Sequence, residues 1–448
     1  MINSSIITYC QFIFMSISSI SILTGEVFPV TDIMINGDQD SRVNIVFLGD
    51  GYTQEEMNDY IDDVGEVVEG LFSAVPYSNY INYFNVFAIE VPSNESGTDH
   101  PGTANDCGGD AGNVFYADTY FNSTFDYYGI HRLLVPLNTS AAYDVLIDNT
   151  PQWDIIFLMV NTTIYGGSGG AFATFSRNAA STEIAVHELG HSFAGLADEY
   201  WYSGWEAANM TQESNPLLNK WNPWLYDNDI GIYQYEDPGY NWYRPHQNCK
   251  MRYLGPSFCS VCAEETIKSV YSILDLIDSY FPENLELIVP VFGAEYFSIN
   301  PILNIPNSIT IDWFIDEQPI LQGSTNLELE ASLYSEGEHE VKVVVKDLSD
   351  LVRNDPLSLL ESEVIWNMTI ECNAEGDLNM DGMVNIQDVI LLVNNVIDIS
   401  IDVSCADLNS DGEINIQDII ILYRCVIEEV VWPVLLTSIN TKLYIILV

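Results

Sequence analysis

The chain has 448 residues, and its 13 Lys and Arg stand against 65 Asp and Glu, which gives a formal net charge of −52. A surface of this charge repels nucleic acid and anionic membranes, so nucleic-acid binding is excluded as a function. With 48% hydrophobic residues the composition forms cores, which excludes global disorder, and the length predicts about three domains.

Residues 1–25 predict a secretory signal peptide. They contain no charged side chain and hold an apolar run from Ile6 to Ile22, so we place cleavage near Gly25. The expected location is secreted or extracellular, with cell-surface association as one form of it.

Cysteine usage agrees with export. After the signal, four cysteines lie in the first large region (Cys107, Cys249, Cys259, Cys262) and three near the end (Cys372, Cys405, Cys425). Two disulfides in the first group, a third in the second and one leftover thiol would fit these numbers.

The last residues, 430–448, form an apolar tail of unknown role. Pro433, Ser438, Asn440 and Lys442 interrupt it, whereas a membrane span needs about 20 cleaner residues, so we expect no membrane span. The tail is either a packed strand pair or a sorting or anchoring end.

Residues 26–283 predict one α/β domain. Apolar runs of strand length occupy 44–49, 84–91 and 154–160, and Thr53 with Glu56 forms a capping box that opens a helix running toward Phe72. A second helix is expected from about Thr182. Strands that alternate with helices predict a mainly parallel or mixed sheet covered on its faces.

Residues 284–372 have a different character. Alternating or β-branched runs at 285–292, 308–315, 338–346 and 363–370 are separated by Gly, Pro, Asn and Asp, a pattern typical of an all-β immunoglobulin-like sandwich. The segment carries no recognisable chemistry, so we interpret it as a spacer or a binding module.

The segment HELGHSFAGLADEY, residues 187–200, carries the chemistry. His187 and His191 are four residues apart and project from one helix face, where two imidazoles can hold one Zn²⁺, and Glu188 can reach a water on that metal. Gly195 can end the helix and turn the chain back, so Asp198 could complete the ligand set. Glu199 is the competing donor.

This segment resembles the secreted zinc metallopeptidases named for their immunoglobulin-A-cleaving member, which are zincins of metzincin-like type. The resemblance also rests on FLGDGYTQEE, YFNVFAIEVPSNESGTDHPG, YGGSGGAFATFS and NCKMRYLGPSFCSVC. It implies a zincin-like catalytic domain with His187 and His191 as zinc ligands, Glu188 as general base and Asp198 as third ligand. Gly195 and Asp198 stand one residue further from His191 than metzincins place them.

Two more stretches are similar to parts of that fold. Met251 and Tyr253 resemble the methionine turn beneath the zinc, and the resemblance implies that Tyr253 stabilises the oxyanion. His246 is either an alternative ligand or oxyanion donor, or a loop histidine without function, which is the reading we favour. The glycine-rich residues 166–176 precede the zinc helix, where zincins place an edge strand that aligns the substrate by backbone pairing.

An internal repeat with a period of 30 residues runs from 376 to 427, within a domain predicted over 373–429. Its two copies are GDLNMDGMVNIQDVILL from 376 and ADLNSDGEINIQDIIIL from 406. Acidic and amide residues take positions 1, 3, 5, 9 and 12 of two EF-hand-like loops, each with Gly at position 6. The loops resemble type I dockerin repeats, which implies a small α-helical domain, two Ca²⁺ ions and a cohesin-like partner. The expected calcium ligands are Asp377, Asn379, Asp381, Asn385 and Asp388, then Asp407, Asn409, Asp411, Asn415 and Asp418.

Together these features predict a secreted zinc endopeptidase that hydrolyses protein or peptide substrates and carries a calcium-dependent docking module. A binding or adhesion protein with an inactive zincin fold, displayed through its dockerin, is the main alternative. An intact Glu188 argues against it. A third interpretation is a zinc hydrolase that acts on an amide other than a peptide bond, because the site activates water but does not determine which acyl group is attacked.

Overall fold

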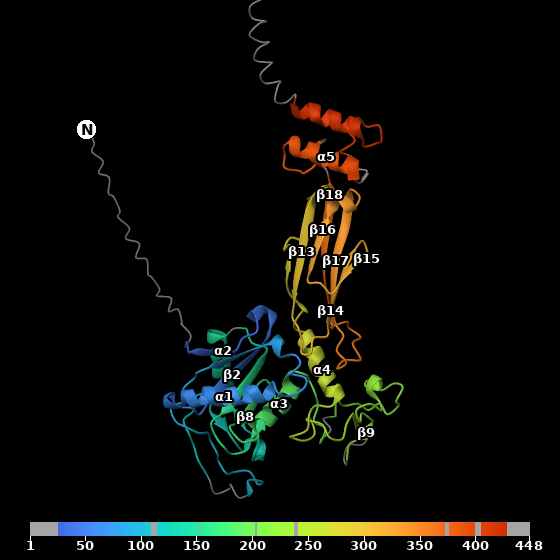
Figure 1. The fold of residues 1–448 in the computed structure, drawn as a ribbon. Helices are drawn as coiled ribbons and strands as arrows, with labels where there is room; N and C mark the ends of the chain where they lie inside the picture. The colour runs from blue at the N-terminus through green and yellow to red at the C-terminus, as the bar shows by residue number, and fades with distance from the viewer. Residues whose placement is uncertain are drawn as a thin grey trace, which may run out of the picture.

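The computed structural model describes residues 26–108, 114–150, 152–201, 204–236, 241–371, 376–398 and 405–427. The predicted signal peptide and the apolar tail lie outside these residues. An α/β unit, a pair of β-sheets and a small helical unit follow one another along the chain (Figure 1). Across the described ranges, no helix is both long and apolar enough to cross a membrane.

A six-stranded sheet in the order β1-β3-β2-β6-β8-β7 forms the centre of the α/β unit. Strands β3, β2, β6 and β8 run parallel, and β1 and β7 pair antiparallel at the two edges. The strands are β1 (Val30–Met34), β2 (Val43–Asp50), β3 (Phe84–Ile89), β6 (Ile155–Val160), β7 (Gly167–Ser168) and β8 (Ala173–Ser176). The predicted strands at 44–49, 84–91 and 154–160 are confirmed, as is the mainly parallel sheet.

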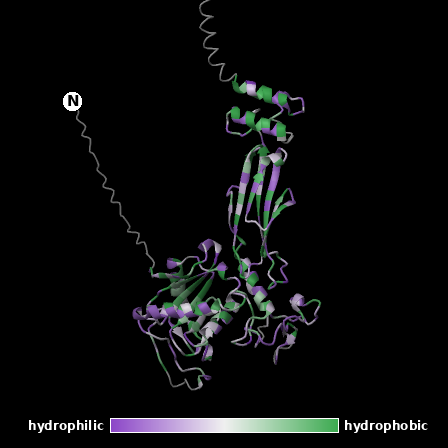
Figure 2. Ribbon diagram, in the orientation of Figure 1, coloured by the Kyte–Doolittle hydropathy of each residue, from purple (hydrophilic) through white to green (hydrophobic). Residues whose placement is uncertain are grey.

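Helices cover both faces of this sheet. Ile45 and Phe47 of β2 pack with α1 (Met57–Leu71) and α3 (Ser181–Ser192), whereas Val46 and Leu48 face α2 (Thr139–Asn149). Because strand side chains alternate between faces, a strand buried on both sides is apolar throughout, and the central strands stand out as hydrophobic (Figure 2). The predicted capping box of Thr53 and Glu56 is present before α1.

Much of the chain between α3 and α4 (Ser260–Tyr271) is irregular. It contains η6 (Asn222–Trp224) and the hairpin of β9 (Tyr233–Gln234) and β10 (Tyr243–Arg244). Earlier in the chain, β4 (Ser123–Thr124) pairs with β5 (Val135–Pro136). The remaining short turns of 3-10 helix are η1 (Gln39–Ser41), η2 (Gln54–Glu56), η3 (Ile81–Tyr83), η5 (Tyr127–Gly129) and η7 (Ala331–Leu333).

Two sheets follow, one of three strands in the order β11-β13-β16 and one of five in the order β12-β18-β17-β14-β15. Phe297 of the first sheet packs on Trp313 and Trp366 of the second. The strands are β11 (Ile277–Phe281), β12 (Glu286–Pro290), β13 (Ala294–Pro301), β14 (Ile309–Ile315), β15 (Gln318–Gln322), β16 (Asn326–Glu330), β17 (Gly337–Asp347) and β18 (Glu361–Glu371). The four predicted strands correspond to β12, β14, β17 and β18.

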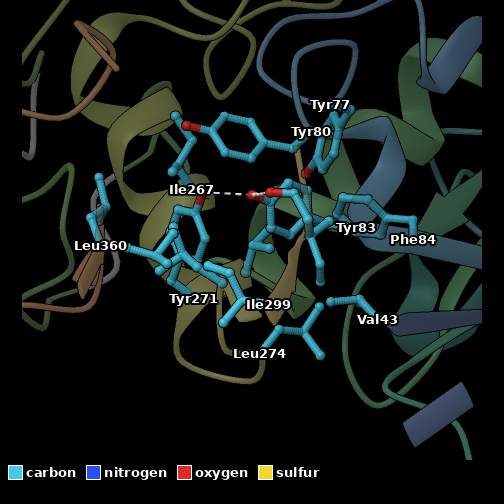
Figure 3. Packing of buried hydrophobic residues seen from close by; sticks show 14 of the residues in the cluster. Val43, Tyr77, Tyr80, Tyr83, Phe84, Ile267, Tyr271, Leu274, Ile299 and Leu360 are labelled. Atoms are coloured by element: carbon cyan, nitrogen blue, oxygen red, sulfur yellow. Dashed lines mark hydrogen bonds between the residues drawn. The ribbon is translucent and has the colours of Figure 1, made fainter. Parts of the chain in front are cut away.

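A buried polar cluster joins the α/β unit to these sheets. The hydroxyls of Tyr80 and Tyr271 donate to Asp347 Oδ2 at 2.6 and 2.9 Å, while Ser308 and Asn304 donate to its Oδ1. Tyr83 lies beside them, its hydroxyl 3.0 Å from that of Tyr271, within an apolar surround that includes Ile299 and Leu360 (Figure 3). Because Asp347 is buried, its carboxyl group needs hydrogen-bond partners, and both units supply them.

The C-terminal unit consists of two loop–helix repeats. The first loop leads into α5 (Ile386–Asp398), and the second leads into a helix over 416–427. Leu378, Leu392 and Leu422 are buried between the repeats. The predicted helix after each loop is confirmed.

Candidate active site and metal centres

Helix α3 positions the two histidines of the HELGH segment. Ala185 and Leu189 are buried in the core, which fixes the other side of the helix toward a cleft. His187 and His191 lie one turn apart with ring centroids 4.8 Å from each other.

A turn then brings the chain back beneath the histidines. Gly195 has a φ of +59°, a left-handed conformation that glycine adopts readily, and the N–H of Leu196 donates to the carbonyl of Gly190 at 3.0 Å. As a result Asp198 Oδ1 lies 3.4 Å from His187 Nε2 and 3.2 Å from His191 Nε2. The structure therefore brings together the three predicted donors.

The hydrogen bonds of the rings fix which nitrogens are available. His187 Nδ1 lies 2.9 Å from the carbonyl oxygen of Lys250, and His191 Nδ1 lies 2.7 Å from that of Leu196. A carbonyl only accepts, so both Nδ1 atoms carry hydrogen and both neutral rings direct an Nε2 lone pair at the other, 3.2 Å away. Two lone pairs and a carboxylate oxygen that meet at one point suit a cation.

The charges of the cluster follow from its surroundings. Burial works against ionisation of Asp198, but the two imidazoles beside its carboxylate, each donating from Nε2 when it is protonated, hold the pKa of that carboxyl below its usual range. Burial also opposes the charge on His191, yet the Asp198 carboxylate raises the pKa of that ring above its ordinary value. Burial raises the pKa of Glu188.

These residues line a cleft with a volume of about 870 Å³. Glu188 faces Gly169, where an added Cβ would lie 2.5 Å from Glu188 Oε2, so any larger residue there would displace that carboxylate. Aromatic and cationic side chains that the sequence did not single out complete the walls, namely Arg132, Tyr165, Tyr200, Trp201 and Trp205. Burial raises the pKa of Tyr200 to about 12, so its hydroxyl stays protonated.

The glycine-rich segment lies along the same cleft. Gly167 and Ser168 form β7 at the edge of the sheet, and Gly169 follows in the cleft wall. Gly167 is bridged to Leu133 on its outer side, so the edge is open only after Gly167.

The CKMRY segment lies beneath α3. Met251 is fully buried, and a Cβ at Gly190 would come within 2.6 Å of its Sδ, so the helix and the methionine turn are in close contact. Tyr253 lines the cleft and is 49% exposed, with Arg252 stacked over its ring. His246 accepts a hydrogen bond from Asn248 N at its Nδ1 and is absent from the residues that line this cleft.

Glu199 points away from the histidines. Its carboxylate lies with the thiols of Cys249, Cys259 and Cys262, and the four donor atoms lie within 4.8 Å of one another. All three cysteines are free, and so is Cys107, which contacts Asp126. The prediction of two disulfides in this region is therefore wrong, because Cys107 lies apart and an odd number of thiols remains. Cys372 lies outside the described residues, so the third disulfide stays a prediction.

The repeat loops have the geometry of calcium loops. Asp388 and Asp418, at position 12, are fully buried and each accepts backbone N–H groups from both ends of its own loop. Gly382 and Gly412 at position 6 have φ values of +80° and +84°. Asp377 Oδ1 is buried without a hydrogen-bond partner, which fits a cation in the loop. The other predicted ligands, Asn379, Asp381, Asn385, Asp407, Asn409, Asp411 and Asn415, lie in the same two loops.

The described chain thus combines a cleft of converging imidazoles and carboxylates with a separate C-terminal pair of loop–helix repeats. Residues 31–229 match the family model for IgA Peptidase M64, and residues 375–426 match the Dockerin type I domain. The first region is therefore similar to the IgA Peptidase M64 family, and the second is similar to type I dockerin domains. Together they imply metal and calcium binding and a cohesin partner.

Other comparisons add little. No curated protein matches the chain. Among solved structures it is similar to the fibronectin(III)-like modules of CbhA from Clostridium thermocellum, at 13% identity and a TM-score of 0.15, over 20% of this chain and 93% of that one. A likeness of this level carries no argument about the fold.

Proposed function

We propose that this chain is a secreted zinc-dependent endopeptidase with a zincin-like catalytic domain over 26–283. An immunoglobulin-like sandwich would follow over 284–372, and a dockerin domain that binds two Ca²⁺ ions over 373–429. The observation that carries the proposal is the convergence of His187 Nε2, His191 Nε2 and Asp198 Oδ1 beside Glu188 in one cleft.

The donor set fits zinc. Two neutral imidazoles and one carboxylate are a common ligand set for catalytic Zn²⁺, and the chain leaves the fourth side open toward the cleft. When bound, Zn²⁺ supplies a Lewis acid that polarises the scissile carbonyl and makes water acidic.

The residues of the chain would transfer the protons, stabilise the oxyanion and orient the imidazoles. Glu188 takes a proton from the attacking water and returns it to the leaving amine, and burial of its carboxyl favours the first of these steps by raising its proton affinity. Tyr253, on the cleft wall, donates a hydrogen bond to the oxyanion. Both carbonyls that hold the imidazoles, from Lys250 and Leu196, keep the rings in the tautomer that the metal needs.

The shape of the cleft favours an extended peptide. Its wall includes the edge strand β7 and Gly169, where a substrate backbone could pair beyond Gly167. Tyr200, Trp201 and Trp205 offer flat apolar faces for side chains of that peptide. These features support a peptide substrate over a small amide.

The test is zinc content and hydrolysis of casein by the secreted chain, wild type beside Glu188→Gln, with and without chelator. We expect zinc in both proteins and cleavage by the wild type alone. Glu69→Gln, an exposed position on α1, is the matched control and should cleave like the wild type. Zinc-loaded wild type that cleaves neither casein nor a peptide library would refute the proposal.

A further inference from the structure

The strongest feature outside the proposed active site is the cluster of Glu199, Cys249, Cys259 and Cys262. All four residues are buried, and Glu199 is 0% exposed. Cys262 Sγ lies 3.7 Å from Cys249 Sγ, 3.6 Å from Cys259 Sγ and 3.4 Å from Glu199 Oε1. Four donor atoms from three separate stretches of chain therefore meet at one point.

The carboxylate of Glu199 lacks a counter-charge among the described residues. Asn209 donates to its Oε1 at 3.1 Å, but its Oε2 is buried and has no hydrogen-bond partner. Arg244 donates to the backbone carbonyl of Glu199 and pairs with Glu236. Burying a charged carboxylate without a neighbouring cation is unfavourable, so the surroundings of Glu199 favour binding of a cation.

The distances fit a tetrahedral ion. With Zn–S bonds of about 2.3 Å, the edge between two thiolates of a tetrahedron is about 3.8 Å, close to the two observed thiol–thiol distances. Cys259 N also donates to Cys249 Sγ at 3.3 Å, a bond that stabilises a thiolate. Thiolate-rich sets of four select zinc over calcium or magnesium, which prefer oxygen.

We propose that Glu199, Cys249, Cys259 and Cys262 bind one Zn²⁺ in a second, structural site. The four ligands close the coordination shell, so this ion has no open position for water or substrate and no part in hydrolysis.

The second site supports the floor of the cleft. Lys250 and Met251 follow Cys249, and they contact the first site through the Lys250 carbonyl on His187 and the Met251 side chain beneath Gly190. Glu199 N donates to the Met251 carbonyl at 2.8 Å. A metal that clamps Glu199 to Cys249 therefore fixes the methionine turn and the chain that carries Asp198.

The first experiment counts metal in the full secreted chain and in His187→Ala/His191→Ala, which removes the first site. After loading with zinc in the presence of calcium, we expect about two zinc ions in the wild type and about one in the double variant. Loaded with Co²⁺ instead, the double variant should show thiolate-to-cobalt charge-transfer absorption. A double variant that holds no metal or lacks this absorption would overturn the proposal.

The second experiment places the ion on these ligands. In the double-variant background, Cys262→Ser should abolish the cobalt–thiolate absorption, whereas Cys107→Ser, a buried free cysteine outside the cluster, should retain it. Alkylation of the three thiols in the zinc-loaded protein, followed by mass mapping, leaves the cluster unmutated. This measurement therefore does not require a cysteine variant that folds. Protection of all three thiols until a zinc chelator is added supports the site, and a disulfide between any two of them refutes it. Neither readout depends on peptidase activity.

Discussion

Asp198 and Glu199 are consecutive in the chain, yet the carboxylate of Asp198 contacts the two histidines and that of Glu199 contacts the cysteine cluster. Asp198 Oδ1 lies within 3.4 Å of both imidazole Nε2 atoms, while Glu199 Oε1 lies 3.4 Å from the thiol of Cys262. The backbone between them is held by the bond from Glu199 N to the Met251 carbonyl. One dipeptide therefore contributes a carboxylate to each of two donor clusters.

This relationship separates the effects of two substitutions. Asp198→Ala removes a charged donor from the histidine site, and we expect its zinc affinity to fall more than about 100-fold, with loss of casein cleavage. Glu199→Gln should leave the histidine site able to bind zinc and lower the affinity of the cysteine site. Chelator competition measures both affinities, and the reverse pattern would show that Glu199 is the catalytic ligand.

Glu188→Gln keeps the shape of the side chain and removes its ability to accept a proton. We expect kcat on a peptide substrate to fall by about 10² to 10⁴-fold, with zinc content unchanged. Steady-state kinetics with metal analysis of the same samples checks this. A loss of activity that zinc loss accounts for would instead indicate a structural role.

The buried hydrogen bonds between the α/β unit and the sheets should contribute to the free energy of unfolding. Tyr80→Phe and Tyr271→Phe each remove one donor from Asp347, and each should lower the free energy of unfolding by about 1 kcal/mol, because the buried carboxylate loses a partner. Urea unfolding followed by tryptophan fluorescence measures the change. Tyr226→Phe, at a position 85% exposed, serves as control and should leave stability unchanged.

Asp126 gives the chain an acid-sensitive contact. Burial works against its charge, but hydrogen bonds from His131, Thr103 N and Ala104 N lower the pKa of its carboxyl to about 2. Because the folded pKa lies below the unfolded value of about 3.9, its contribution is present above that value and is lost as the pH falls toward 2. Asp126→Asn should therefore cost about 1 to 2 kcal/mol at pH 7 and progressively less below about pH 4. Urea unfolding across this pH range tests it, and a cost independent of pH would contradict it.

Calcium should control the C-terminal unit without affecting the cleft. Asp411→Ala removes a ligand at position 5, whereas Glu413→Gln changes a position 7 residue whose backbone carbonyl is the expected donor. We expect the first variant to lower calcium affinity at least about tenfold and the second to leave it nearly unchanged, as measured by calorimetry. Casein cleavage should persist in both.

Sequence reasoning captured the features that follow from local periodicity. The buried strands around Ile45 and Phe157, the helix after Thr53 and the loop–helix repeats are each encoded within a short window of residues. The spacing of His187 and His191 is also local, since one helical turn brings them together. Asp198 could be placed with them because Gly195 indicates that the helix ends and the chain turns back.

The rest depends on contacts between distant segments. Cys249, Cys259 and Cys262 suggested disulfides in an exported chain, and only the fold shows that Glu199, fifty residues earlier, completes their cluster. Three clustered cysteines, an odd number, were the one signal available. Trp201 and Trp205 reach the cleft through the irregular chain after α3, which sequence patterns do not place. Strands β13 and β16 were missed because each has only two buried positions, too few for a recognisable apolar run.

The pairing of β12 with β18 gives the module between cleft and dockerin a mechanical property. These two strands run parallel. The chain enters the module close to β12 and leaves it toward the C-terminal unit at the end of β18. Tension between the two ends would pull β12 and β18 past each other along their length, so their hydrogen bonds share the load in shear and do not open one after another. Forced unfolding is limited by the unfolding rate, and a shear geometry slows that rate. If the C-terminal unit is anchored while the cleft holds a substrate, the module between them would resist unfolding by the pulling force.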